Sequence, residues 1–203
     1  MDEREVFGLA DRALLGVVNR VRTDQWSMTM PPEFTARGAD HPPTLREVIN
    51  AHAYDDAWVP EMLAGRTMDE VGRDAHRGNL LGDSTDDHAG YFTAYVEGAC
   101  AAAEAVEDLD ATVHLSYGDY PVREYFWQIT NFRGLRAHDI AKAVGQDTDL
   151  PPELVQGIWE QVLPKAEEWR SYGVFSVSVP VPEDAPLQDR LLGLTGRRPD
   201  NSY

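Results

Sequence analysis

The chain has 203 residues, a length that predicts one domain spanning residues 1–203, and 42% of them are hydrophobic, which is enough for a buried core. The formal net charge of −17 argues against nucleic-acid binding, because phosphate recognition needs a basic stripe and the sequence has none. Cys100 is the only cysteine, which excludes an internal disulfide and a paired-cysteine metal site. Its alanine-rich surroundings predict a small core residue.

The sequence shows no sign of export or membrane insertion. Its first residues lack a basic region followed by an apolar block. No stretch approaches the roughly 18 apolar residues of a membrane span. We therefore expect a cytoplasmic protein with no membrane partner.

Two helices are predicted in the first third of the chain. Apolar residues recur at helical spacing from Glu5 to Arg22. The proline-rich loop that follows, Trp26 to Pro43, is long enough to act as functional cover. Thr44 and Glu47 then form the pattern of a capping box, which opens a second helix that runs to about Ala64.

The second helix carries polar residues on its apolar face. His52 and Asp56 stand one turn apart on that face, and Asp55 lies at its edge. Pro60 lacks an N–H group and so leaves the carbonyl of Asp56 without its usual helical partner. This pattern fits either a helix bent around the core or a functional site beside the bend.

The middle of the chain is predicted to be less regular. A long connection from Gly65 to Thr85 includes one short helical turn, Thr67 to Val71, and an alanine-rich helix runs from Asp86 to about Val106. Residues 109–119 are predicted to be irregular or briefly extended. His88 and His114 are expected to be solvent-exposed.

The segment from Tyr120 to Gly145 is predicted to be a helix with an unusual face. Asp119 is a candidate N-cap, Pro121 suits the first turn, and Gly145 suits a left-handed end. At about 100° per residue, Arg133 and Arg136 fall on the apolar face. A charge in that position needs a partner or a ligand.

The C-terminal part is predicted to add shorter elements. A fifth helix begins at Asp149 and reaches about Arg170, with a kink at Pro164. Residues 173–182 alternate like a short strand or extended arm, and a last helix covers Leu187 to Leu194. Four long helices predict an all-α up-and-down four-helix bundle with short accessory helices, in which a site forms between facing helices.

Four segments carry a family resemblance in a consistent order along most of the chain. They are Val59–Gly72, Asn79–Asp83, His138–Asp147 and Asp189–Pro199. They resemble actinobacterial DinB-like proteins related to the N-terminal domain of mycothiol-dependent maleylpyruvate isomerase. The resemblance implies a DinB-like bundle whose metal-binding members hold zinc or another divalent ion, and several such proteins use a thiol cofactor for transfer or isomerisation.

The sequence departs from the metal-ligand pattern that the resemblance implies. The family's histidine on the later long helix falls on Arg136, and its partner four residues earlier falls on Phe132. On the second helix the family's histidine falls on Ala51, one residue before His52. Since the apolar periodicity places His52 nearer the centre of the face, His52 is the candidate for that role.

These observations favour a pocket between the second and fourth long helices that works without a metal. Arg136 provides a fixed positive charge, Asp139 pairs with it at i,i+3 spacing, and His52 suits acid–base work. The candidate catalytic residues are His52, Asp56, Arg136 and Asp139. The candidate substrate-binding residues are Arg133, Tyr54, Trp58, Trp127 and Phe132.

Other interpretations of the same residues stay open. A zinc ion could use His52, Asp56 and Asp139 together with a low-molecular-weight thiol, although Arg136 would repel the ion. Equally, the charges could form a buried structural network. The function is therefore predicted as an isomerase, cyclase or thiol transferase acting on a small molecule, or a metal-dependent thiol transferase, or a non-catalytic ligand-binding bundle, with a homodimer left open.

Overall fold

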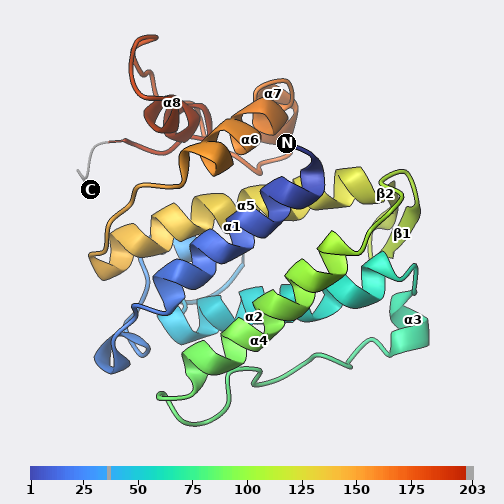
Figure 1. The fold of residues 1–203 in the computed structure, drawn as a ribbon. Coiled ribbons are helices and arrows are strands. Elements are labelled where there is room, and N and C mark those ends of the chain that lie inside the picture. The colour runs from blue at the N-terminus through green and yellow to red at the C-terminus, as the bar shows by residue number, and fades with distance from the viewer. Residues whose placement is uncertain (36–37, 200–203) are drawn as a thin grey trace.

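The computed structural model describes residues 1–35 and 38–199, with the backbone alone at Asn131 and Phe132. The described residues are mostly helical, as predicted, and they also include one small two-stranded sheet (Figure 1). The longest helices within these ranges are α1 (Glu3–Val18), α2 (Leu45–Leu63), α4 (His88–Glu104) and α5 (Val122–Val144). The shorter elements are η1 (Thr23–Gln25), η2 (Pro32–Phe34), α3 (Met68–Val71), β1 (Thr112–Leu115), β2 (Gly118–Pro121), α6 (Pro152–Val162), α7 (Ala166–Ser171) and α8 (Leu187–Leu194).

The long helices pack against one another in a simple order. α2 packs on α4, α4 on α1, and α1 along α5. α6 rests on both α1 and α5, and α8 packs on α6, so the C-terminal helices lie across the α1/α5 pair from α2 and α4 (Figure 1). No helix in the described ranges is both long and apolar enough to cross a membrane.

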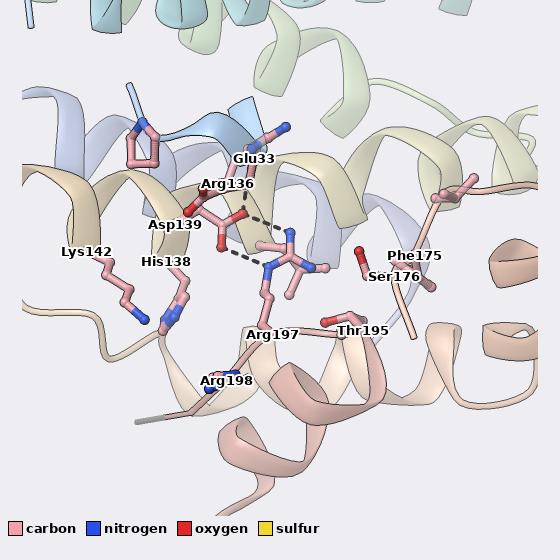
Figure 2. A pocket seen from close by; sticks show the side chains of 14 residues that line it. Glu33, Arg136, His138, Asp139, Lys142, Phe175, Ser176, Thr195, Arg197 and Arg198 are labelled. Carbon is pink, nitrogen blue, oxygen red and sulfur yellow. Dashed lines mark hydrogen bonds and ion pairs between the residues drawn. The ribbon is translucent and has the colours of Figure 1, made fainter. Parts of the chain in front are cut away.

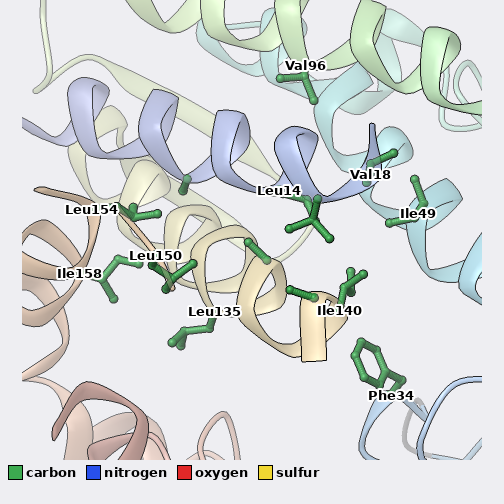
Figure 3. Packing of buried hydrophobic residues seen from close by; sticks show 14 of the residues in the cluster. Leu14, Val18, Phe34, Ile49, Val96, Leu135, Ile140, Leu150, Leu154 and Ile158 are labelled. Carbon is green, nitrogen blue, oxygen red and sulfur yellow. The ribbon is translucent and has the colours of Figure 1, made fainter. Parts of the chain in front are cut away.

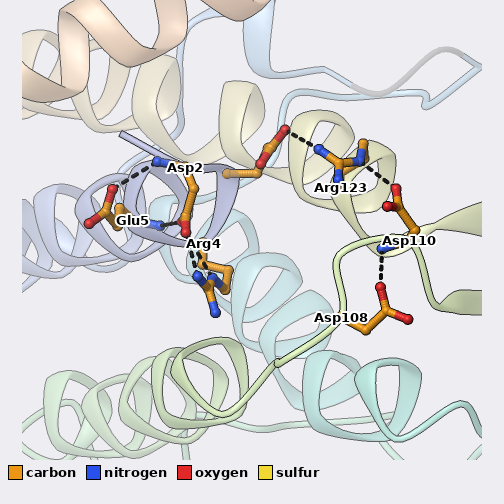
Figure 4. A network of polar contacts seen from close by, with 7 residues as sticks. Asp2, Arg4, Glu5, Asp108, Asp110 and Arg123 are labelled. Carbon is orange, nitrogen blue, oxygen red and sulfur yellow. Dashed lines mark hydrogen bonds and ion pairs between the residues drawn. The ribbon is translucent and has the colours of Figure 1, made fainter.

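The start of α1 is tied to the start of α5 by charged side chains (Figure 4). Asp2 and Glu5 form a capping box that satisfies free N–H groups in the first turn of α1. Arg123, in the first turn of α5, pairs with Glu3 of α1 and with Asp110 of the preceding loop. These contacts align the two helices at one end.

The start of α2 agrees with its sequence signal. Thr44 caps the helix and Glu47 bonds back to the Thr44 N–H, which completes the predicted capping box. Thr29 pairs with Thr44 as an isolated antiparallel bridge, so the proline-rich loop is anchored at that point. The helix continues past Pro60 to Leu63.

A β-hairpin occupies part of the segment predicted to be irregular or briefly extended. β1 and β2 pair antiparallel, with Thr112 opposite Pro121 and Leu115 opposite Gly118. Asp119 lies within β2, and its carboxylate is 2.8 Å from His114 Nδ1. The predicted N-cap role of Asp119 is therefore wrong, and α5 begins directly after Pro121 without a side-chain cap.

For the C-terminal part, the single fifth helix is a wrong prediction, and of the two alternatives predicted for residues 173–182, a short strand or an extended arm, the strand is excluded. The fifth helix is two helices, α6 and α7, because the chain turns around Pro164 instead of kinking there. Residues 173–182 form no strand. Instead the N–H of Val179 donates to the carbonyl of Gly193 at the end of α8. The two backbones approach so closely that a Cβ atom at residue 193 would lie 2.6 Å from the carbonyl oxygen of Val179, so glycine fits this position.

The hydrophobic core joins the helices along their inner faces (Figure 3). One cluster brings Leu14 of α1, Ile140 of α5 and Ile158 of α6 together, and a second lies beside the hairpin. Cys100 is buried in the first cluster, as predicted. His88, expected to be exposed, is buried, because its Nδ1–H donates to the Leu81 carbonyl (2.7 Å) and its Nε2 accepts from Arg46.

Candidate functional site

Arg133 of α5 is a buried charged residue that faces both α1 and α2. Its side chain is 1% exposed, and its Nε–H donates to Asp56 Oδ1 at 2.8 Å. A second N–H group of the guanidinium donates to the same oxygen. Asp11 of α1 lies on the other side, with Oδ1 2.5 Å from Arg133 Nε. Arg133, Asp11 and Asp56, which we call the buried trio, therefore join three helices.

The buried trio carries two carboxyl groups for one guanidinium. Burial raises the pKa of Asp11 well above its ordinary value, and the nearby Asp56 charge raises it further. Neither oxygen of Asp11 accepts a hydrogen bond from the described residues, whereas Asp56 accepts two from Arg133. The raised pKa favours the protonated form of Asp11, which would reduce the excess of negative charge in this buried region.

The buried trio changes the roles predicted for two residues. Arg133 was predicted to bind substrate and Asp56 to be catalytic, but neither lines any of the described cavities around the helices. Asp11 was missed. Its signal was present, because Asp11 lies at i+4 from Phe7 and i−3 from Leu14, on the apolar face of α1.

His52 lines a cavity of about 380 Å³ between α2, α5 and the proline-rich loop, which we call the His52 cavity. Asp55 and Arg136 also line it, and the loop contributes Phe34 and His41, as its predicted covering role requires. Burial, together with the positive charges of Arg133 and Arg136, lowers the pKa of His52 to about 3. A neutral imidazole with this pKa is a weak base, which argues against the predicted acid–base role of His52 near neutral pH, and that role stays a prediction.

The lowered pKa of His52 predicts a pH-dependent stability. Because the unfolded chain protonates His52 near its ordinary value of 6.5 and the folded protein only near 3, stability falls as the pH drops below about 6.5. The slope from this group approaches about 1.4 kcal/mol per pH unit. Urea unfolding from pH 7.5 to 4.5 should show a shallower decline for His52→Gln than for the parent protein. Parallel curves would contradict the assignment.

A larger cavity of about 900 Å³, the aromatic cavity, opens between α2, the hairpin, the first half of α5, and α7. The predicted substrate-binding residues Tyr54, Trp58 and Trp127 all line it. Tyr54 and Trp58 meet edge to face, with ring centroids 6.3 Å apart. Further aromatic side chains complete the walls: Tyr117, Tyr120, Tyr125, Trp169 and Tyr172.

Asp55 lines both the aromatic cavity and the His52 cavity. Its carboxyl group makes no hydrogen bond or ion pair with any residue that the structure describes. Its side chain is exposed to solvent, yet the neighbouring walls raise its pKa, although the Arg133 charge acts in the opposite direction. Sequence reasoning placed Asp55 at the edge of the α2 face without giving it a role.

Asp139 lies in a third cavity, away from His52. It accepts two hydrogen bonds from Arg197, both 2.8 Å long, and lies 3.8 Å from Arg136. The predicted Arg136–Asp139 pair is therefore present but long, and Arg197 is the principal partner. Arg136 also stacks on Phe34, with its guanidinium carbon 4.5 Å from the ring centroid.

The residues do not fit the alternative metal site. Asp56 is held by Arg133 and Asp139 by Arg197, so His52, Asp56 and Asp139 do not converge. Among the described residues, no three His, Cys, Asp or Glu side chains form a candidate metal site. Phe132 was predicted to bind substrate, but its side chain lies outside the described part of the structure.

The chain was compared with family models, curated proteins and solved structures, and none of them matches. The DinB-like resemblance therefore stays a prediction. The candidate site rests on the geometry of the three cavities and on the charges around them.

Proposed function

We propose that the protein is an enzyme that binds a small planar organic molecule in the aromatic cavity and shifts a proton on it, as an isomerase or cyclase does. The observation that carries this proposal is the position of Asp55 in a cavity lined with aromatic rings, where its solvent-exposed carboxyl group pairs with none of the described residues. Rings that stack on a flat ligand bind it, and a carboxyl group without a protein partner is available to the ligand.

Two side chains suit proton transfer in this cavity. A carboxylate with a raised pKa is a stronger base than an ordinary aspartate, so Asp55 can take a proton from a carbon next to a carbonyl group and return it at another position. Burial also raises the pKa of Tyr125, which keeps its hydroxyl protonated. That hydroxyl donates to no described residue, so it is free to bond the carbonyl oxygen of the ligand as negative charge develops there.

This proposal reassigns the roles of the polar residues between α2 and α5. The neutral His52 would bond a polar group of the ligand at the end of the cavity that Asp55 shares. Arg133 and Asp56 would hold α2 and α5 together.

We also propose that the helical fold is the DinB-like four-helix bundle that the four sequence segments suggest. The packing order of α2, α4, α1 and α5 supports this, and so does the location of the aromatic and His52 cavities between α2 and α5. The proposed proton transfer in the aromatic cavity does not depend on the chain having a DinB-like fold.

A non-catalytic binding protein is the second candidate function. Aromatic walls with carboxylates, Asp55 among them, also suit a ligand that carries a positively charged amine, which the rings and Asp55 would hold without reaction. The two candidates differ in whether a neutral ketone with exchangeable protons is turned over.

Binding in the aromatic cavity can be tested with 1-tetralone, a neutral planar ketone, by quenching of tryptophan fluorescence. Tyr172 is 72% exposed at the rim of the cavity, and Tyr91 is 49% exposed on α4, outside it. Tyr172→Ala should weaken binding about threefold to tenfold, since one aromatic contact is lost. Tyr91→Ala, the matched control, should bind like the parent protein. Equal affinities in all three proteins would overturn the proposal.

A further inference from the structure

The third cavity, of about 440 Å³, gathers positive charge in a chain whose net charge is −17. We call it the basic cavity (Figure 2). It lies between the second half of α5, residues 174–176, and the residues after α8. Four cationic side chains line it: Arg136, Lys142, Arg197 and Arg198.

The cations of the basic cavity outnumber its anions. Among the described residues that line it, Asp139 and Glu33 are the carboxylates, against four cationic side chains. His138 does not add to them at neutral pH, because burial lowers its pKa. Such a local excess attracts a small anion that fits within the walls, even in an acidic protein.

The arginines of this cavity are ready to donate hydrogen bonds. Asp139 holds Arg197 through two parallel bonds, which fix its guanidinium plane beside the cavity (Figure 2). Arg136 is 25% exposed, and within the described residues it donates no hydrogen bond to a protein acceptor. A partly buried guanidinium in that state gains from a ligand that accepts its N–H groups.

We propose that the basic cavity binds a small oxyanion that carries two or more negative charges, such as the phosphate group of an ester or a polycarboxylate. Arginine forks match the oxygen spacing of both groups. Phe175 is buried in the same wall and offers an apolar surface to the rest of such a molecule.

Long polyanions do not fit this site. A nucleic acid would extend beyond the cavity and meet the repulsion of a surface with a large negative net charge. The proposal is independent of the proposed function, because the basic cavity and the aromatic cavity share only Val174 among their lining residues.

Isothermal titration with inorganic pyrophosphate and, separately, with citrate, at constant ionic strength, tests the proposal. We expect saturable binding to the parent protein by at least one of the two. Arg136→Gln and Arg198→Gln should each weaken it about tenfold, as expected for the loss of one charge-assisted contact. Arg190→Gln removes the same charge from α8, where Arg190 stacks on Trp159 outside the cavity, and should bind like the parent protein.

The outcomes separate the ligand class from simple charge attraction. Tighter binding of pyrophosphate identifies a phosphate site, and tighter binding of citrate identifies a carboxylate site. Binding that weakens equally in Arg190→Gln would show attraction to overall charge and would overturn the proposal, as would the absence of saturable binding by either anion. Thermal melting of each variant confirms that it is folded before titration.

Discussion

Replacing Arg133 with methionine is expected to destabilise the protein by about 3–5 kcal/mol, because it leaves two buried carboxyl groups without their cation. Methionine keeps most of the length of the side chain, so the loss reflects charge more than volume. The defect should grow as the pH rises above about 4. Arg133 lowers the pKa of both carboxyl groups in the folded protein, so its loss raises these pKa values further above those of the unfolded chain. Ionisation with rising pH therefore costs the variant more stability than it costs the parent.

Urea unfolding at pH 5 and pH 7 measures this effect, with two comparisons. Arg123→Met removes an arginine that pairs with Glu3 and Asp110 at the surface, and it should cost less than about 1 kcal/mol. The triple variant Arg133→Met, Asp11→Leu, Asp56→Leu should recover much of the lost stability, since it removes the stranded carboxyl groups as well. A triple variant less stable than Arg133→Met would contradict the view that uncompensated charge causes the loss.

The helices could be predicted where local signals decide the structure. Thr44 and Glu47 start α2, and Gly145 ends α5 in the left-handed conformation, because each of these interactions spans only a few residues. The hairpin could not be placed from the sequence. Its second strand ends at Pro121, which pairs with Thr112, and the residues there also carry the signals of a helix start. The alternating residues 173–182 have the pattern of a strand, but Val179 hydrogen-bonds to Gly193 at the end of α8 instead of to a neighbouring strand.

The candidate site was only partly predictable for a geometric reason. Periodicity placed Arg133 and Arg136 on one face, yet three residues on a helix differ by about 60° in direction. That difference puts Arg133 inside the core and Arg136 between two cavities. The partner of Arg133 on α1, Asp11, is distant in sequence, so helix periodicity alone could not pair them.

The lining of the aromatic cavity was also only partly predictable from the sequence. Tyr54, Trp58 and Trp127 were predicted from their closeness in sequence to the α2/α5 interface, and they do line one cavity. Tyr117 and Trp169 line it too, but they come from the hairpin and from α7, whose positions depend on tertiary packing. Asp55 became a candidate only when its lack of a protein partner was visible.

Asp55→Asn is expected to lower the rate of proton exchange on a bound ketone by at least about 100-fold, because asparagine keeps the shape of the side chain but cannot accept the proton. The measurement is the incorporation of deuterium next to the carbonyl group of 1-tetralone in D₂O, followed by NMR. The affinity for the ketone should change little, since the ligand is neutral. In the parent protein the rate should rise with pH as Asp55 ionises and then level off, with the midpoint above the ordinary aspartate value.

Glu124→Gln is the matched control, because Glu124 lines the same cavity and carries the same charge. It should exchange deuterium at the rate of the parent protein, since the proposed base is untouched. If Glu124→Gln abolishes exchange and Asp55→Asn does not, the base has been assigned to the wrong carboxyl group. If the parent protein binds 1-tetralone but exchanges no faster than Asp55→Asn, the cavity only binds, and the second candidate function replaces the first. An enzyme requires both that the exchange saturates with ketone concentration and that it depends on this one carboxyl group, because stacking on aromatic walls explains affinity but moves no proton.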